Sequence, residues 1–300
     1  MTSTSRSHPK LFSSFLLPAT ILTVALLAFV PVAFGQAGDP GGDTVSKDLS
    51  LDLGNGVSLK LVHIPAGKFK MGNNDTPPET IKKVGGKEEH LTDEYPAHEV
   101  TISKPFYMGI YEVTQAQWKA VMGTEPWKGE QYVKEGPNYA ATYVSWDDAV
   151  AYCKKLSEKE GKTYRLPTEA QWEYACRAGT KTMWSFGNDE KALGDYAWYE
   201  KNAYNAGEKY AHQVGLKKPN AFGLYDMHGN VWEWCTDWYV PGSYSKTRQA
   251  DPVGPASGDA RVQRGGGWSS AVKRCRSAAR IGRSPSDYRG SYLGFRVVLK

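Results

Sequence analysis

The sequence contains few cysteines and lacks the short motifs that mark several common enzyme classes. It has four cysteines, and no two of them have C-x-x-C spacing, so a zinc site built from cysteines is not expected. Phosphate-binding loops, serine nucleophile elbows and the H-E-x-x-H motif of zinc proteases are also absent. The sequence therefore gives no indication of nucleotide, serine-hydrolase or zinc-protease chemistry.

A strong net charge and internal repeats are absent as well. The formal net charge is +5, and it falls to +3 when Arg6 and Lys10 are set aside. Because the remaining charge is small and scattered, nucleic acid is not expected as a partner. No repeat and no second change of composition divides residues 53–300, which we interpret as one domain.

Residues 1–36 have the pattern of an export signal. Arg6 and Lys10 precede a nearly apolar run over residues 11–34, and small residues suited to signal peptidase follow it. The run is long for a signal peptide, so an uncleaved membrane anchor is the alternative. We expect an exported protein, periplasmic, secreted or on the cell surface, that contacts a membrane only if this segment stays uncleaved. Residues 37–52, rich in Gly, Asp and Ser, are interpreted as a linker.

Three helices are predicted from their capping residues. Thr114, Ser145 and Thr168 each precede an apolar periodic stretch and have Gln or Asp three positions later. Glycines at positions 123, 161 and 179 end these stretches. The charged, turn-rich residues 73–95 indicate a surface loop. Short strands are predicted over residues 59–64, 69–71, 98–102 and 294–299.

The segment 223–239 is unusually aromatic, and it contains Trp232, Trp234 and Trp238. Each tryptophan buries a large area and usually needs a partner for its indole N–H, so the segment is either core or the floor of a binding site. His228, which has no nearby partner in the sequence, is expected to be structural.

An ordered set of motifs spans residues 61–298, and together these motifs resemble the formylglycine-generating enzyme family, or sulfatase-modifying factors. The resemblance implies an α+β fold like that of C-type lectins, with short strands, a few helices and many loops. It also implies copper-dependent oxidation of a sulfatase cysteine. The motifs are I-P-A-G at 64–67, M-G at 71–72, Y-E-V-T at 111–114, R-L-P-T-E-A-Q-W-E-Y-A at 165–175, G-N-V-W-E-W at 229–234, R-G-G-G-W at 264–268, A-A-R at 278–280 and G-F-R at 294–296.

The chain departs from the family pattern where the oxidases carry two copper-binding cysteines. Ser269 and Ser270 lie near the first cysteine position and Val272 near the second, and Gly267 replaces the motif serine. Copper(I) prefers soft thiolate ligands, and neither serine nor valine supplies one. We therefore expect no copper and no cysteine oxidation, although the fold is expected to be kept.

The resemblance also implies a cation and a disulfide. Asp226, Glu233 and the carbonyls of Gly229 and Val231 match family ligands of a calcium ion, and oxygen ligands suit this hard cation. The alternative is that Asp226 caps a turn and Glu233 pairs with an arginine. Family positions favour a Cys176–Cys275 bridge. Cys235 is an alternative partner for Cys275, and Cys153 is expected to be unpaired.

Arginines recur within the motifs, and we expect buried ion pairs, with ligand contact as the alternative. Two functions follow from these observations. The chain binds a protein, peptide or glycan in the family's cleft, or it is an oxidase of a protein or small molecule; the missing cysteines favour binding. The candidate cleft residues are Trp232, Trp234, Trp268, Arg276 and Arg280.

Overall fold

The computed structural model describes residues 48–300, and the predicted signal segment lies outside the described residues. Among residues 48–300, no helix combines the length and apolar character needed to cross a bilayer. The α-helices are α1 (Pro77–Val84), α2 (Gln115–Met122), α3 (Trp146–Glu160), α4 (Glu169–Arg177) and α5 (Leu193–Tyr196). Short 3-10 turns are η1 (Glu88–His90), η2 (Thr92–Glu94), η3 (Glu190–Ala192) and η4 (Val272–Arg274).

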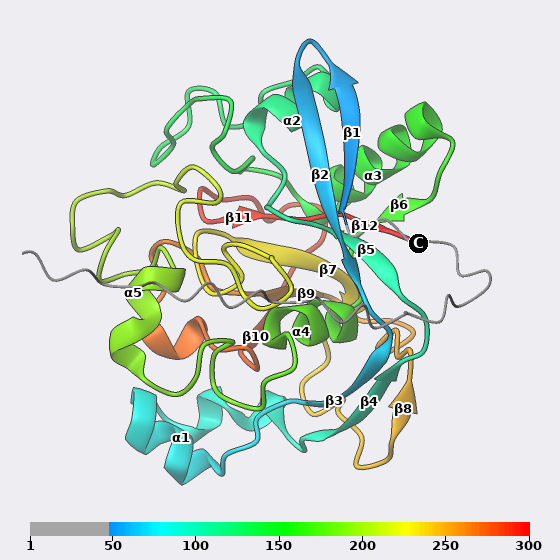
Figure 1. Ribbon diagram of the computed structural model, residues 1–300. Helices are drawn as coiled ribbons and strands as arrows, with labels where there is room; N and C mark the ends of the chain where they lie inside the picture. Colours follow the sequence, from blue (N-terminus) through cyan, green and yellow to red (C-terminus); the bar gives the residue numbers. More distant parts are fainter. Residues whose placement is uncertain (1–47) are drawn as a thin grey trace, which may run out of the picture. The chain divides into compact units, whose positions relative to one another are not determined.

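Twelve short strands form three sheets in the described part of the chain (Figure 1). The five-stranded sheet has the order β1-β2-β5-β12-β6, the four-stranded sheet β10-β9-β7-β11, and the three-stranded sheet β3-β4-β8. The strands are β1 (Asp48–Gly54), β2 (Val57–Ile64), β3 (Gly67–Met71), β4 (His98–Ile102), β5 (Phe106–Gly109), β6 (Tyr164–Arg165), β7 (Trp232–Trp238), β8 (Gln249–Ala250), β9 (Arg261–Arg264), β10 (Arg280–Arg283), β11 (Leu293–Gly294) and β12 (Val298–Leu299). This mixture of short strands, few helices and long loops confirms the predicted α+β class.

The three predicted helices are present with the predicted caps. Thr114, Ser145 and Thr168 each accept a hydrogen bond from the backbone N–H three residues later, and each capping box is complete. Gly123 and Gly161 end α2 and α3 in the left-handed conformation. Ala178 takes this role in α4, one residue before the predicted glycine.

Three predictions about the local structure were wrong. Residues 48–52, assigned to the linker, belong to β1, where Leu51 and Leu53 are buried. The predicted surface loop at 73–95 contains α1, which Thr76 and Glu79 cap, and its Asp93 and Glu94 are buried. The predicted strand at 294–299 is divided, because β11 pairs with β7 whereas β12 pairs with β5 and β6 in another sheet.

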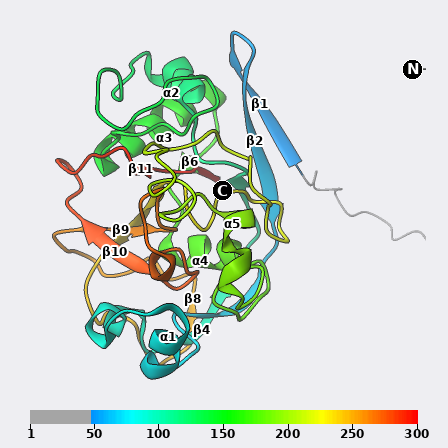
Figure 2. The same ribbon diagram turned by 90° about the vertical axis from the view of Figure 1, so that its left-hand side faces the viewer.

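Two large apolar clusters fill the interior. One lies between the β1–β2 hairpin, α2, α3 and the aromatic strand β7, and it includes Trp118, Tyr152 and Trp234. The other packs α4 against β2, β4 and β5 around Trp172 and Met108. In Figures 1 and 2, the β1–β2 hairpin and α1 lie at opposite ends of the folded domain formed by residues 48–300, with α4 between them.

Candidate functional site

The loop after β9 contains Ser269, Ser270 and Val272, the positions at which the resemblance leads us to expect the cysteines of the family. It begins with Gly265 and Gly266, whose φ angles are +97° and +83°. A Cβ on Gly266 would lie 2.9 Å from the sulfur of Cys275, so the tight packing here requires glycine. The loop is held further by the N–H of Trp268, which donates to the carbonyl of Asn230 at 2.7 Å.

The side chains at the degenerate positions have structural contacts. The hydroxyl of Ser270 accepts a hydrogen bond from the N–H of Gly267 at 2.9 Å and closes the turn. Val272 is buried against Trp184 and Leu193, whereas Ser269 is partly exposed. Cys275, the nearest thiol in the sequence, is fully buried, and burial raises the pKa of its thiol well above the usual value. This loop therefore presents no reactive thiolate to solvent.

Aromatic side chains surround the loop and form what we call the aromatic platform, made of Tyr132, Tyr204 and Trp268. The ring of Trp268 lies 6.0 Å from that of Tyr204, nearly parallel to it, and 6.1 Å from that of Tyr132. Trp268 is buried, while Tyr132 and Tyr204 are 53% and 41% exposed. The platform therefore combines a rigid base with two accessible tyrosine rings.

The backbone of Tyr132 is strained. Its φ of +58° is uncommon for a bulky side chain and costs free energy, and such conformations cluster at binding and catalytic sites. The hydroxyl of Tyr143 donates to the carbonyl of Gln131 at 3.0 Å and holds this segment in place. Ammonium groups lie over nearby tyrosines: Lys209 is 4.7 Å from the Tyr204 ring centre and Lys134 is 4.9 Å from that of Tyr210.

Among the predicted cleft residues, only Trp268 belongs to this surface. Trp232 and Trp234 are core residues of β7, and the indole of Trp234 donates to the carbonyl of Val144 at 3.0 Å. Both arginines are buried in two-point ion pairs, Arg276 with Glu94 and Arg280 with Glu169, at 2.6 to 2.8 Å. Trp232, Trp234, Arg276 and Arg280 are therefore buried, and none of the four belongs to the aromatic platform.

Tyr132 and Tyr204 were missed by sequence reasoning. They lie in loops far apart in the chain and belong to no motif, and only the fold brings them to Trp268. The nearest signals in the sequence are the glycines at 129 and 207, which mark turns beside each tyrosine.

Comparison with known proteins identifies the domain. Residues 56–300 match the sulfatase-modifying factor enzyme 1-like domain. The chain belongs to the sulfatase-modifying factor family. It is 33% identical to the formylglycine-generating enzyme of Mus musculus over 321 aligned positions, covering 88% of this chain and 79% of that protein. It is 30% identical to the inactive C-alpha-formylglycine-generating enzyme 2 of Bos taurus, covering 83% and 90%.

Solved structures share the fold of the family. Treponema denticola variable protein 1 superimposes with a TM-score of 0.71 at 31% identity, covering 84% of this chain and 98% of that one. PvdO from Pseudomonas aeruginosa gives a TM-score of 0.70 at 30% identity, covering 84% of this chain and 98% of that one. The expected fold of the sulfatase-modifying factor family is thereby confirmed.

The disulfide suggested by other members of the family is not present. All four cysteines are free and buried. The sulfur of Cys176 lies 3.7 Å from the hydroxyl oxygen of Ser277. The carbonyl oxygen of Cys275, two residues earlier, is 2.9 Å from Nδ1 of His228. The predicted Cys176–Cys275 bridge was therefore wrong.

His228 has the structural role that the sequence predicts. It is buried, and its Nε2 lies 2.9 Å from the hydroxyl of Ser185. Burial lowers the pKa of its imidazole to about 4, so the ring is neutral near pH 7 and holds two loops together through hydrogen bonds.

The residues predicted to bind calcium lie in a buried cluster rich in carboxylates. Both oxygens of Glu233 accept from Arg296, at 2.6 and 2.7 Å, as the alternative reading of Glu233 predicts. Asp226 accepts from the N–H of Gly215 at 2.7 Å through Oδ2, whereas its buried Oδ1 has no partner in the described chain. Burial raises the pKa of Asp226 to about 6 and that of Glu112 well above its usual value.

Calcium fits this cluster in part. The orphaned Oδ1 of Asp226 suits a hard cation, and three buried carboxyls face the single guanidinium of Arg296. Among residues 48–300, no group of three or more Asp, Glu, His or Cys side chains is close enough to hold a metal ion, so any ion here would depend on main-chain carbonyls. The carbonyls of Gly229 and Val231 are the ones that the family pattern assigns.

Proposed function

We propose that this protein is an exported binding member of the sulfatase-modifying factor family that captures a peptide or glycan on the aromatic platform and does not oxidise cysteine. The observation that carries the proposal is the loop Gly267–Val272, where hydroxyl and apolar side chains stand at the cysteine positions of the family pattern. Without a pair of thiolates, this loop offers copper(I) no site of the kind the oxidases use.

The platform supports binding in place of oxidation. Accessible tyrosine rings supply large apolar contact area at a low cost in side-chain entropy. Lys209 and Lys134 lie over neighbouring rings and add positive charge at the rim. The strained backbone of Tyr132 keeps one ring beside Trp268 before any ligand arrives, which lowers the entropic cost of binding. A relative described as inactive shows that the family is not confined to oxidases.

The proposal is tested by two measurements on the mature protein. In the first, a peptide containing C-x-P-x-R is incubated with copper-loaded protein and oxygen, and mass spectrometry follows conversion of cysteine to formylglycine. We expect no conversion. Turnover comparable to that of an active family member would establish the oxidase instead and overturn the proposal.

The second measurement screens peptide and oligosaccharide arrays with the unmodified protein and with Tyr132→Ala and Tyr204→Ala. Both tyrosines are exposed, so the fold tolerates their loss. The exposed Leu216 provides a matched control, Leu216→Ala. We expect the peptides or oligosaccharides that bind the unmodified protein to bind the Leu216→Ala control as well. They should no longer bind either tyrosine variant. Unchanged binding by both tyrosine variants would exclude the platform as the site.

A further inference from the structure

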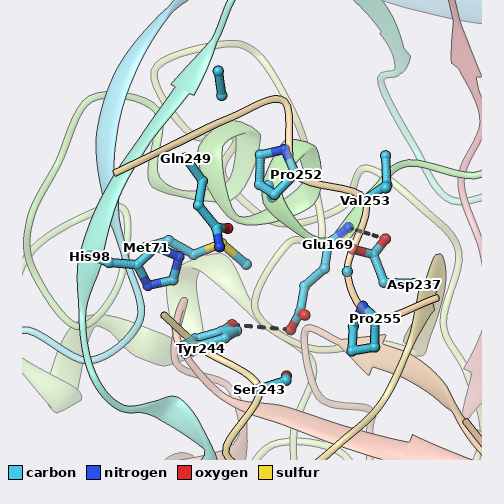
Figure 3. Close-up of a pocket in the computed structure, with 13 residues that line it drawn as sticks. Met71, His98, Glu169, Asp237, Ser243, Tyr244, Gln249, Pro252, Val253 and Pro255 are labelled. Atoms are coloured by element: carbon cyan, nitrogen blue, oxygen red, sulfur yellow. Dashed lines mark hydrogen bonds between the residues drawn. The ribbon is translucent and has the colours of Figure 1, made fainter. Parts of the chain in front are cut away.

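A cavity of about 480 Å³ lies between the three-stranded sheet, the start of α4 and the segment that follows β8. Met71, His98, Glu169, Asp237, Tyr244 and Gln249 line it, and it shares no residue with the aromatic platform. Figure 3 shows His98, Met71 and Gln249 on one side of the space and Asp237, Val253 and Pro255 on the other, with Glu169 between them. We call this space the acid pocket.

The ionisable groups that line the acid pocket are mainly acidic. Two carboxyl groups line it, and no lysine or arginine does. Glu169 is balanced from behind by Arg280, which donates to both of its oxygens at 2.7 and 2.8 Å. Asp237 has no such partner, because no basic group in the described chain lies within 4 Å of its carboxyl group.

Asp237 is the side chain that points to a ligand. It is 3% exposed, and its Oδ2 accepts from the N–H of Glu169 at 2.8 Å and from the hydroxyl of Thr236 at 3.0 Å. Its Oδ1 makes no hydrogen bond within the described chain and points toward the middle of the pocket in Figure 3. Burial, together with the nearby Glu169 carboxylate, raises the pKa of Asp237 to about 7. A cation beside Oδ1 would stabilise the charged form of this buried carboxyl group.

Other acceptors face the same space. Nδ1 of His98 lies 3.1 Å from the carbonyl oxygen of Pro96, so Nδ1 carries the proton in the neutral ring and Nε2 is left as an acceptor. Gln249 extends its amide into the pocket beside the sulfur of Met71 (Figure 3). Pro252 and Val253 add apolar surface at the mouth, where Val253 is 70% exposed.

We infer that the acid pocket binds a primary ammonium group carried on an aliphatic chain. The ammonium donates to Oδ1 of Asp237, while Nε2 of His98 and the amide oxygen of Gln249, on the opposite side of the space, are acceptors for other donors of the ligand. A guanidinium fits less well, because its paired donors need both oxygens of a carboxylate and Asp237 has only one available. The methylenes of the ligand pack on Met71, Pro252 and Val253. The source of the group is a lysine side chain of a polypeptide or a free alkyl amine.

The experiment is isothermal titration calorimetry of the full chain at pH 8 with three probes. Nα-acetyl-lysine-N-methylamide represents the polypeptide, 1,5-diaminopentane represents the free amine, and Nα-acetyl-norleucine-N-methylamide is the uncharged control. We expect both amines to bind and the norleucine probe not to bind. The tighter amine identifies the source. Equal binding of the norleucine and lysine probes, or no binding of either amine, would overturn the inference.

Variants locate the site. Asp237→Asn keeps an acceptor for the N–H of Glu169 and removes the charge, so amine affinity should fall about ten- to a hundredfold through loss of a charge-assisted hydrogen bond. Val253→Trp fills the exposed mouth and should also abolish binding. Asp195→Asn removes an exposed carboxylate that pairs with Lys218 elsewhere on the surface, and it should bind as the unmodified protein does. Unchanged affinity in both pocket variants would refute the assignment.

Discussion

At the scale of single residues, several buried arginines of this protein each bind a buried glutamate through two hydrogen bonds. Arg276 meets Glu94, Arg280 meets Glu169 and Arg296 meets Glu233, each through two hydrogen bonds. Removing either partner of such a pair leaves a buried charge without compensation. Against this pattern, the carboxyl groups of Asp226 and Asp237 stand out because no arginine or lysine in the described chain pairs with them.

The excess of acid around Asp226 predicts a response to calcium. An ion that binds only the folded state at a hundred times its dissociation constant stabilises that state by about 2.7 kcal/mol. For a domain of this size, such a gain raises the melting temperature by about 5 to 10 °C. We expect this rise when calcium is added to chelator-treated protein in a thermal melt, and we expect Asp226→Asn to reduce it.

The control for the calcium effect is Asp195→Asn, since Asp195 is an exposed surface acid. Its melting temperature should rise with calcium as much as that of the unmodified protein. If calcium does not raise the melting temperature of the unmodified protein, the proposal that this cluster binds calcium is wrong.

At the scale of elements, α4 organises the interior through its acidic residues. Glu169 and Glu173 pair with Arg280 of β10 and Arg264 of β9, and Glu173 also pairs with Arg177 at the end of α4 itself. Glu173 also accepts from the N–H of Gly72 at 2.9 Å, which ties the end of β3 to the helix. The helix therefore links the three-stranded and four-stranded sheets by charge as well as by the packing of Trp172.

We predict that Glu173→Gln lowers the free energy of unfolding by about 3 to 5 kcal/mol, because Arg177 and Arg264 lose their carboxylate in a buried setting. Urea denaturation measures the change. The exposed pair of Glu190 and Lys201 offers the comparison, and Glu190→Gln should cost about 1 kcal/mol or less. Equal losses in the two variants would contradict the assigned role of α4.

Local chemistry predicts α2, α3 and α4 well, whereas it did not reveal α1 or the buried acids. Thr114, Ser145 and Thr168 cap their helices through contacts within three residues, so the sequence contains the whole signal. Glu94 is buried only because Arg276 reaches it from a distant segment, and no local pattern records that contact. The same contrast holds for the candidate site. The sequence motif points to the loop at 267–272, whereas only the tertiary structure shows that Tyr132 and Tyr204 lie beside Trp268 in this loop.

At the scale of the whole molecule, packing and ion pairs hold the domain together without covalent links between its segments. The four cysteines are free, and burial raises the pKa of Cys176 and of Cys153 to about 12. Thiols of this kind are largely unreactive near neutral pH.

We therefore predict that the melting temperature is the same with and without reductant. Peptide mapping under non-reducing conditions, after alkylation of the unfolded chain, should find all four cysteines labelled. A drop in melting temperature on adding reductant, together with a linked pair of cysteine peptides, would contradict the free thiols seen here.

The position of β12 has a consequence for biosynthesis. Its residues Val298 and Leu299 pair with β5 on one side and with the edge strand β6 on the other, although they follow every other described strand in sequence. A ribosome therefore releases β1, β2 and β5 long before their sheet can be closed. Contacts between segments so distant in sequence form slowly, and the exposed edge of β5 can meanwhile pair with other chains. We therefore expect an unfinished chain to be prone to association through β5 until β12 is available to pair with it.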